Sequence, residues 1–248
     1  MVDAFTYQFP LNETARSYLR IEHLLLRCTQ AMQALNEQAF LSYFSALFDL
    51  LELLERADVR QDLIKDLEGQ QKELARWATY PNVDLDALKQ LDQSNQHCLS
   101  ALRSQSRLAN CLKSDKFLSG IRQRFSIPGG NCCFDLPQLY YWMSQDSESC
   151  LQDMNRWLSQ LDILANAIGQ LMHLTRDGKL FQPAVAKKGF YQASAENLQL
   201  LRIRVSSDSK VFPTVSGNKH RFTVRFMRHT NNGTAATEQD IEFLLSAS

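Results

Sequence analysis

Apolar residues recur at spacings of three and four along the first two-thirds of the chain, which is the repeat of an amphipathic helix. In residues 14–35 this repeat forms one continuous apolar stripe. Its members are Tyr18, Ile21, Leu25, Cys28, Met32 and Leu35. The repeat predicts further helices over residues 40–54, 63–77 and 88–102. Asn12 precedes the first helix and is predicted to be its N-cap.

A longer run of the same repeat covers residues 149–178. It predicts one helix of about 26 residues, roughly 39 Å long at ~1.5 Å per residue. Trp157, Leu164 and Leu171 add a second apolar stripe, so we expect this helix to be buried on more than one side. Gly178 is its expected C-terminal cap.

After Pro183 the pattern changes to a strict alternation of apolar and polar residues, which is the period of a β-strand. Residues 200–208, 221–229 and 239–245 show this alternation, with turn residues between them. Pro213 confines its own segment to a sheet edge or a bulge. Three such strands predict a small antiparallel sheet with one apolar and one charged face.

The two patterns together predict the α+β class. We expect an N-terminal α-helical bundle domain over residues 11–182 and a small antiparallel β domain over residues 183–248, which the N-terminal segment 1–10 is a candidate to join as a further strand. The leucine-rich helices are expected to bury one apolar face in the core and to expose a solvated outer face. Part of their apolar area is also compatible with a dimer interface. Dimerisation is expected in the helical domain.

Charge is balanced over the whole chain but unevenly distributed along it. Lys plus Arg and Asp plus Glu both number 27, so net charge does not favour DNA or a membrane surface as a partner. Residues 179–248, however, hold 10 basic against 5 acidic residues. A second basic stretch contains one acid, Asp115, among Arg103, Arg107, Lys113, Lys116, Arg122 and Arg124. This segregation indicates anionic partners.

The N-terminus and the cysteines indicate a cytoplasmic protein. The first ten residues, MVDAFTYQFP, contain an early acid and no apolar stretch, so they do not resemble a signal peptide. No uninterrupted apolar run approaches the roughly 18 residues of a membrane helix. Six cysteines without a signal sequence are expected to be reduced thiols.

Residues 126–137, SIPGGNCCFDLP, lie between helical patterns and combine two prolines, two glycines and two adjacent cysteines. Pro128 holds the preceding residue extended, and Gly129 and Gly130 permit positive φ. Asp135 is predicted to be an N-cap that forms a capping box with the glutamine three residues later. These features predict a structural elbow between two helices, which fixes where neighbouring arginines point.

The elbow does not match a metal or catalytic motif. Adjacent cysteines lack the spacing of a zinc site, and no histidine lies close to Cys132 and Cys133 in the sequence. His23, His97 and His173 have no ligand residue at helical spacing. No P-loop, GxSxG, HExxH or GxGxxG motif occurs. We therefore expect no metal, no cofactor and no catalytic residue.

The outward-facing arginines of the strands are the strongest chemical signal. Arg202 and Arg204 are expected to share one face with Arg221 and Arg225 if their strands belong to one sheet. Such a face needs acids or an anionic ligand because adjacent like charges repel one another. The last strand supplies Asp240 and Glu242, which would neutralise the face. The surplus of cations favours a surface that binds carboxylates instead.

Several stretches of the chain closely resemble ZapD, a family of bacterial cell-division proteins. They are RIEHLL, LLERADVRQDLIKDLE, RQRFSIPGGNCCFDLPQLYYW, GFYQ and DSKVFPTVSGNKHRFTVRFM. The resemblance runs essentially from end to end, is weakest over residues 98–116 and after residue 228, and is most specific in IRQRFSIPGGNCCFDLP.

The resemblance implies a non-enzymatic homodimer that binds the C-terminal tail of FtsZ and cross-links FtsZ filaments at midcell. It implies a fold with a helical domain and a β domain. Charge placement then suggests a basic tail-binding pocket that combines Arg221 and Arg225 with residues of the helices. The full set of predicted partner-binding residues is Arg56, Lys116, Arg122, Arg124, Arg202, Arg204, Arg221 and Arg225.

Two other functions are weighed against this one. The basic strands carry aromatic residues, as nucleic-acid-binding strands do, but the phase of Phe222 and Phe226 suits a core better than a stacking surface. An enzyme that uses Cys133 or Asp135 lacks the partner residues which such chemistry requires. We therefore expect neither nucleic acid nor a membrane as a partner.

Overall fold

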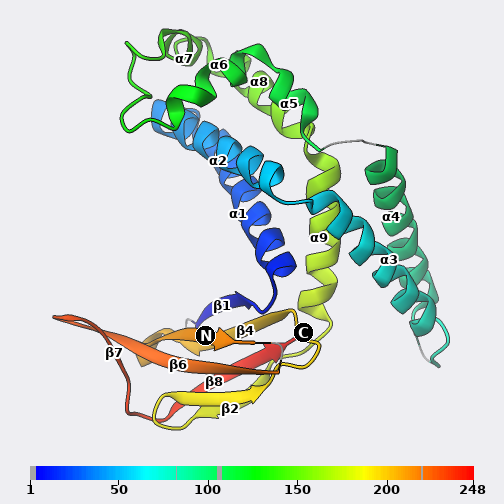
Figure 1. Ribbon diagram of the computed structural model, residues 1–248. Helices are drawn as coiled ribbons and strands as arrows, with labels where there is room; N and C mark the ends of the chain where they lie inside the picture. The colour runs from blue at the N-terminus through cyan, green and yellow to red at the C-terminus, as the bar shows by residue number, and fades with distance from the viewer. Residues whose placement is uncertain (1–3, 82, 105–107, 219) are drawn as a thin grey trace. The chain divides into compact units, whose positions relative to one another are not determined.

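The structure is a computed structural model that describes residues 4–81, 83–104, 108–218 and 220–248 (Figure 1). Arg107 and Lys219, which the sequence places among the basic residues, lie outside the described residues. The chain divides into two compact units. The helical unit comprises residues 20–171, and the β unit combines residues 1–19 with residues 172–248. The fold is α+β, as the sequence predicts.

The first four helices follow the apolar stripes read from the sequence. The helices of the described residues are α1 (Glu13–Ala34), α2 (Glu37–Arg56), α3 (Val59–Trp77), α4 (Leu85–Ser104), α5 (Asn110–Ser114), α6 (Lys116–Phe125), α7 (Pro137–Met143), α8 (Ser147–Ser159) and α9 (Asp162–Asp177). The predicted cap of α1 is confirmed, because Asn12 Oδ1 accepts a hydrogen bond of 2.7 Å from the Ala15 amide.

The prediction of one unbroken helix over residues 149–178 is wrong, because α8 ends at Ser159 and α9 begins at Asp162. The Leu161 amide donates to the Leu158 carbonyl at 2.9 Å, a three-residue bond that tightens and ends α8. Ser159 Oγ donates to the Arg156 carbonyl at 3.0 Å, and such local bonds compete with the helical ladder. The apolar spacing continues in phase across the break and therefore conceals it.

A cluster of aromatic rings forms the core of the helical unit. The Phe44 ring of α2 is fully buried and lies 5.2 Å from the Trp142 ring of α7 and 5.7 Å from the Trp157 ring of α8. Phe117 and Phe125, near the two ends of α6, contact the same Phe44 ring at 6.1 and 6.3 Å. Both α6 and α7 are therefore anchored to one core, and the predicted elbow connects them.

The described strands form two antiparallel sheets. The strands are β1 (Ala4–Pro10), β2 (Gln182–Ala186), β3 (Phe190–Ser194), β4 (Leu200–Ser206), β5 (Phe212–Gly217), β6 (Arg221–Thr230), β7 (Gly233–Ala236) and β8 (Ile241–Ala247). One sheet has the order β1-β4-β8-β2, and the other has the order β3-β6-β5 with β7 paired to β6. Pro213 lies in β5, an edge strand, as its missing N–H requires.

The apolar faces of the two sheets share one core. Leu201 and Ile203 of β4 are buried in the same cluster as Phe222, Val224 and Phe226 of β6. Because successive side chains of a strand alternate between faces, the arginines of β4 and of β6 lie on opposite outer faces of this two-layer arrangement.

The prediction that Arg202 and Arg204 share a face with Arg221 and Arg225 is therefore wrong. β4 pairs with β1 and β8, whereas β6 pairs with β3, β5 and β7. The alternation within each strand is as the sequence predicts, and the error lies in the strand pairing. The positive charge of the β unit is consequently divided between two surfaces.

Candidate partner-binding surfaces

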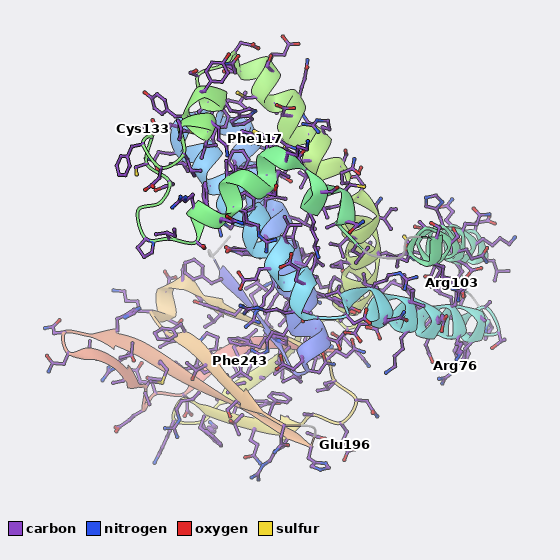
Figure 2. The ribbon with its side chains drawn as sticks, turned by 45° about the horizontal axis from the view of Figure 1, so that its top comes forward. Arg76, Arg103, Phe117, Cys133, Glu196 and Phe243 are labelled. Carbon is purple, nitrogen blue, oxygen red and sulfur yellow. The ribbon has the colours of Figure 1, made fainter. Side chains whose placement is uncertain are left out.

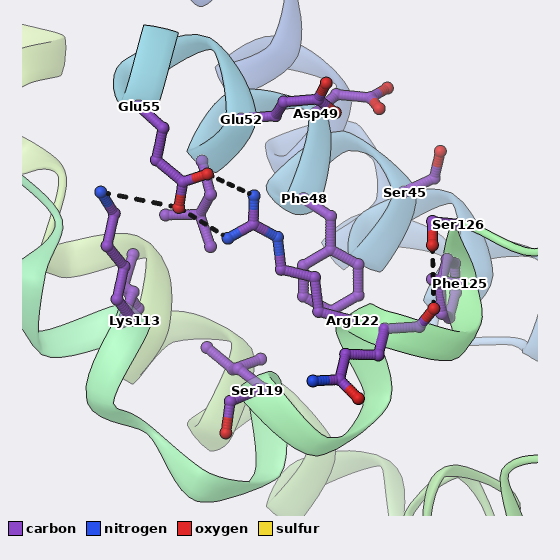
Figure 3. Close-up of a pocket in the computed structure, with 14 residues that line it drawn as sticks. Ser45, Phe48, Asp49, Glu52, Glu55, Lys113, Ser119, Arg122, Phe125 and Ser126 are labelled. Carbon is purple, nitrogen blue, oxygen red and sulfur yellow. Dashed lines mark hydrogen bonds and ion pairs between the residues drawn. The ribbon is translucent and has the colours of Figure 1, made fainter.

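A groove of about 610 Å³ opens between α2 and the pair α5–α6 in the helical unit (Figure 3). Its apolar side is formed by Phe48 and Phe125, whose rings lie 5.3 Å apart edge to face, together with leucines of α2, α5 and α6. Asp115 caps α6 by accepting from the amides of Phe117 and Leu118 at 2.9 and 3.0 Å. This cap fixes where α6 begins.

Arg122 of α6 crosses this groove to Glu55 at the end of α2 (Figure 3). Two hydrogen bonds join them, from Nη1 to Oε1 at 2.8 Å and from Nη2 to Oε2 at 3.0 Å. Lys113 Nζ lies 3.6 Å from Glu55 Oε1. The hydrogen bonding of Arg122 lowers the pKa of Glu55 below its ordinary value, and Glu55 in turn raises the pKa of Arg122. The guanidinium predicted to bind a partner is thus already satisfied within the chain.

The other predicted cations of the helical unit differ in their availability. Arg56 pairs with Glu52 one turn earlier in α2, and both side chains are largely exposed. Lys116 and Arg124 are exposed, and neither side chain forms an ion pair among the described residues. In this unit Lys116 and Arg124 are therefore the predicted site residues that are left for an external anion.

The elbow between α6 and α7 is a series of hydrogen-bonded turns, as its composition predicts. Gly129 adopts a φ of +72°, a conformation that favours glycine. Gly130 is required for a different reason than the predicted one: a Cβ there would lie 2.1 Å from the Arg124 carbonyl oxygen. Its amide donates to the Ile127 carbonyl at 2.8 Å. Pro128 lies in the exposed turn just before these glycines.

The prediction that Asp135 caps α7 is wrong. Leu136 occupies the N-cap position without a side-chain cap, and Pro137 is the first helical residue. Proline suits that position because its missing N–H would have no helical partner there. Asp135 instead accepts a hydrogen bond from Cys132 Sγ at 3.3 Å. The sequence pattern for a capping box is present, but the proline moves the helix start one residue further along.

The outer face of the β3-β6-β5 sheet brings Arg221 and Arg225 together on β6. Arg225 lies opposite Phe190 of β3 and Thr214 of β5 in the strand register. Strands β3, β5, β6 and β7 contain no Asp or Glu, and we call this outer surface the acid-free face. Its members are Phe190, Gln192, Ser194, Thr214, Ser216, Arg221, Thr223 and Arg225.

Both arginines of the acid-free face are exposed. The Arg225 guanidinium lies 5.9 Å from the centre of the Phe190 ring, which restrains it by a cation–π contact. No described acidic side chain pairs with either arginine. Two unpaired guanidinium groups beside hydroxyl and amide side chains suit carboxylate or phosphate ligands. The sequence analysis missed Phe190, because β3 is too short for its alternation to stand out.

Arg202 and Arg204 on the other sheet make internal contacts. The Arg202 Nη2 donates to the Arg176 carbonyl, to the Lys179 carbonyl at 3.1 Å and to Ser246 Oγ at 3.2 Å. Burial lowers the pKa of Arg202. Arg204 Nε donates to Thr6 Oγ1 at 3.2 Å, and both guanidinium groups lie over the Phe181 ring. Arg202 therefore ties the end of α9 to β4, which leaves little of it for a partner.

Asp240 neutralises a different cation from those expected. Its carboxylate accepts from Lys187 Nζ at 2.7 Å and from the Lys188 amide at 2.9 Å, and the bond from Lys187 lowers the pKa of Asp240. Among the described residues Asp240 pairs with none of the strand arginines, and Glu242 lies opposite Val185 of β2. The acids of the last strand thus leave the acid-free face unneutralised.

The His, Cys, Asp and Glu side chains of the described residues do not gather into a metal site. No group of three or more His, Cys, Asp or Glu side chains there is placed to hold a metal ion. Burial raises the pKa of Cys28 to about 12, which keeps that thiol protonated. His23 and His97 are exposed. The expectation that His173 has no ligand residue at helical spacing is wrong, because Asp177, four residues further on, pairs with it at 2.5 Å. No helix in these described residues is both long and apolar enough to cross a bilayer.

A family model described as "ZapD: Cell division protein" matches residues 19–225. The chain belongs to the ZapD family. Curated relatives named "Cell division protein ZapD" include those of Photobacterium profundum, 40% identical over 240 residues, and Idiomarina loihiensis, 40% identical over 245 residues. The relative from Vibrio parahaemolyticus is 38% identical over 240 residues. These matches cover 97–98% of this chain and 96–97% of each relative.

Membership of the ZapD family establishes a role in cell division, and it confirms the resemblance read from the sequence. The match covers α2, the groove, the elbow and the first half of β6. The two surfaces with unpaired cations therefore lie within a region that the ZapD family model recognises.

Proposed function

We propose that this chain is a non-enzymatic cell-division factor which binds the C-terminal tail of FtsZ as a homodimer. Each dimer cross-links FtsZ filaments into bundles and promotes assembly of the division ring at midcell, in the cytoplasm. Family membership supports a role in cell division, and the unpaired cations on the surface support an anionic partner. The observation that carries the proposal is the acid-free face, where Arg221 and Arg225 have no carboxylate partner among the described residues.

The unpaired cations define where an anionic tail would make contact. Within the predicted set, the exposed cations with neither an ion pair nor a side-chain hydrogen bond among the described residues are Arg221 and Arg225 in the β unit and, on a separate surface, Lys116 and Arg124 in the helical unit. Arg122 and Arg202 contribute less in this proposal because internal acceptors already occupy their guanidinium groups. Of the eight predicted partner-binding residues, these four therefore remain the best candidates. Their side chains are solvated and can exchange water for a carboxylate of the ligand.

Two identical tail-binding sites in a dimer explain how weak contacts would produce stable bundles. Once one site holds a filament tail, the second site meets nearby tails at a high effective concentration, which multiplies the net affinity. A twofold dimer holds its two sites in a fixed relation. Because the contacts are between exposed charges, we expect added salt to weaken bundling. At physiological ionic strength the attraction between such charges is screened beyond roughly 8–10 Å.

Sedimentation of FtsZ filaments tests the proposed partner. The purified chain is mixed with polymerised FtsZ, with or without its C-terminal tail, and pelleted at two salt concentrations. We expect co-pelleting and bundling with intact FtsZ and neither with tail-less filaments. Equal co-pelleting of tail-less filaments would refute tail binding, and a monomeric chain in sedimentation velocity would refute the bivalent mechanism.

Charge reversal tests the residues. The double variant Arg221→Glu/Arg225→Glu is expected to weaken tail binding by about tenfold, since each guanidinium–carboxylate contact contributes on the order of 1 kcal/mol. Arg76→Glu is the matched control, because Arg76 is an exposed arginine of the helical unit that lies outside the predicted set. Wild-type bundling by the double variant would exclude the acid-free face as the site.

The aromatic residues of β6 do not favour the nucleic-acid alternative. Phe222 and Phe226, the aromatic residues of the basic strand, are 1% and 0% exposed and cannot stack on bases. The separation of the strand arginines into two sheets also halves the charge of each surface. We expect no mobility shift of single-stranded DNA or RNA at physiological salt.

A further inference from the structure

Phe190 is an exposed aromatic residue whose place on the acid-free face is fixed by the backbone around it. β2 and β3 are joined by a tight turn in which Lys188 and Gly189 have φ of +48° and +69°, the pattern of a type I′ hairpin turn. The Phe190 amide donates to the Lys187 carbonyl at 2.9 Å and closes this turn. The Phe226 amide donates to the Gly189 carbonyl at 2.8 Å, which ties the turn to β6. Phe190 is therefore held at the start of β3, beside β6.

The next residue of β3, Tyr191, points to the opposite side and anchors the strand in the core. Its ring lies 5.4 Å from the Phe243 ring, edge to face, and 6.3 Å from the Phe222 ring. Phe243 lies among the strands of the β unit in Figure 2. Because successive side chains of a strand point to opposite faces, Phe190 is directed to the acid-free face, where 42% of it stays exposed. Phe190 does not belong to the buried cluster against which Tyr191 packs.

Arg225 is the direct cross-strand neighbour of Phe190. The two residues are paired in the register of β3 and β6, and the guanidinium carbon of Arg225 lies 5.9 Å from the centre of the Phe190 ring. On the other side of β6, the Thr214 hydroxyl donates to the Arg225 carbonyl at 3.0 Å. The Arg225 side chain forms neither an ion pair nor a hydrogen bond among the described residues. Within that part of the chain, the Phe190 ring is the contact that restrains its guanidinium.

The acids near β3 leave Arg225 unpaired. Asp240, which contacts the turn between β2 and β3, already accepts from Lys187 Nζ at 2.7 Å and from the Lys188 amide at 2.9 Å. Glu196 follows the opposite end of β3 and lies at the margin of the β unit in Figure 2. An arginine that is held by a ring but has no acid beside it keeps its N–H donors for an external carboxylate.

Arg221, four residues earlier on β6, is not restrained in this way. It lies opposite Ser194 in the strand register, and no described aromatic ring lies under its guanidinium. A free arginine side chain loses much rotamer entropy when a ligand fixes it, whereas a side chain that is already restrained loses less. The two arginines of the acid-free face therefore differ in how far they are ordered before a ligand arrives.

We propose that Phe190 is a positioning residue for Arg225. Its ring holds the guanidinium above the acid-free face, so that a carboxylate of an acidic partner segment binds there at a lower entropic cost. The inference rests on the proposed function for the identity of that segment, the FtsZ tail. Phe190 acts through Arg225 and makes no contact of its own with the ligand.

The test measures binding of a fluorescent FtsZ tail peptide to the full-length chain by anisotropy. Phe190→Leu keeps an apolar side chain on the strand but removes the aromatic face, and it is expected to weaken binding by about threefold. Phe190→Trp is expected to bind at least as tightly as wild type, because tryptophan is the best cation–π partner. Phe5→Leu is the matched control, since Phe5 is a 58% exposed phenylalanine on β1 of the other sheet, and it is expected to bind as wild type does.

A double-mutant cycle with Arg225→Gln separates positioning from the other roles that Phe190 could have. If Phe190 acts through Arg225, Phe190→Leu has no further effect on binding once Arg225 has been replaced. An equal loss in both backgrounds would show that the ring contacts the ligand itself or supports the sheet, and it would overturn the positioning role. The Arg225 Nε–Hε resonance offers a readout without ligand. It is expected to move in Phe190→Leu because the ring current is lost, and an unmoved resonance would also overturn the role.

The possible results separate this inference from the proposed function. If the wild-type chain does not bind the tail peptide, the proposed function fails, and the positioning role for this ligand fails with it. If wild type binds and Phe190→Leu binds equally well, only the role of Phe190 is refuted. If Phe190→Leu weakens binding, Phe190→Trp restores it and the effect vanishes in Arg225→Gln, the positioning role is supported.

Discussion

Replacing Glu55 by glutamine removes one charge from the Arg122–Glu55 ion pair while it preserves the size of the side chain. The pair is bidentate, at 2.8 and 3.0 Å, but the two side chains keep 28% and 37% of their exposure, so solvent screens the attraction. We expect Glu55→Gln to lower the free energy of unfolding by about 1 kcal/mol, which corresponds to a fall in Tm of about 2–4 °C.

The pH dependence of this loss follows from the direction of the pKa shift. Arg122 lowers the pKa of Glu55 in the folded chain, so the pair stabilises the fold above the unfolded pKa of about 4.3 and loses this effect as the pH falls through the folded pKa. Urea denaturation of wild type and Glu55→Gln is therefore expected to differ at pH 7 and to converge as the pH falls through the folded pKa of Glu55.

A double-mutant cycle isolates the interaction from other effects of the substitutions. Glu55→Gln, Arg122→Gln and the double variant are expected to give a coupling energy of about 1 kcal/mol at pH 7. A coupling energy near zero, or a difference from wild type that does not shrink as the pH falls, would show that the pair does not stabilise the fold in the way argued. Glu55→Gln also releases Arg122, and it is expected to strengthen binding of the FtsZ tail severalfold if Arg122 contributes to the site.

Two further predictions concern the elements that flank the groove. Gly130→Ala places a Cβ 2.1 Å from a carbonyl oxygen and is expected to lower the free energy of unfolding by about 3 kcal/mol. Gly129→Ala adds its Cβ in open space and is expected to lower it by about 1 kcal/mol. Similar urea midpoints for the two variants would argue against the close approach at Gly130. Asp115→Ala removes the cap of α6 and the acceptor of Trp157 Nε1 at 3.0 Å, with an expected loss of about 2 kcal/mol in the same assay. The cap of α8 is exposed, so Asp146→Ala is expected to lose less, and an equal loss would contradict the role given to Trp157.

The local elements of the fold were readable from the sequence because local physics fixes them. The apolar stripe of residues 14–35 and the cap at Asn12 predicted α1 to within a residue at its start, since both signals lie within one turn of the helix end. The alternation around Arg221 predicted β6 and the direction of its side chains. Backbone chemistry also predicted the turn at Gly129.

Local signals failed where two influences competed within a few residues. The apolar repeat hid the break at Leu161, because the spacing continues in phase while a three-residue hydrogen bond ends α8. The capping-box pattern at Asp135 was overruled by Pro137, which is better suited to the first position of a helix. In each case the stronger backbone constraint determined the element boundary.

The availability of the predicted arginines depended on the tertiary structure alone. Arg122 lies 67 residues from Glu55 in the sequence, and Arg202 lies 26 residues from the carbonyl of Arg176 that it binds. The pattern of a strand fixes which way its side chains point but not which strand lies beside it, because pairing is a long-range contact. The sequence by itself therefore determined the first four helices, the alternating strands β4, β6 and β8, and the family. Only the folded chain decided where the long helical pattern breaks, which cations remain unpaired and which aromatic rings remain in solvent.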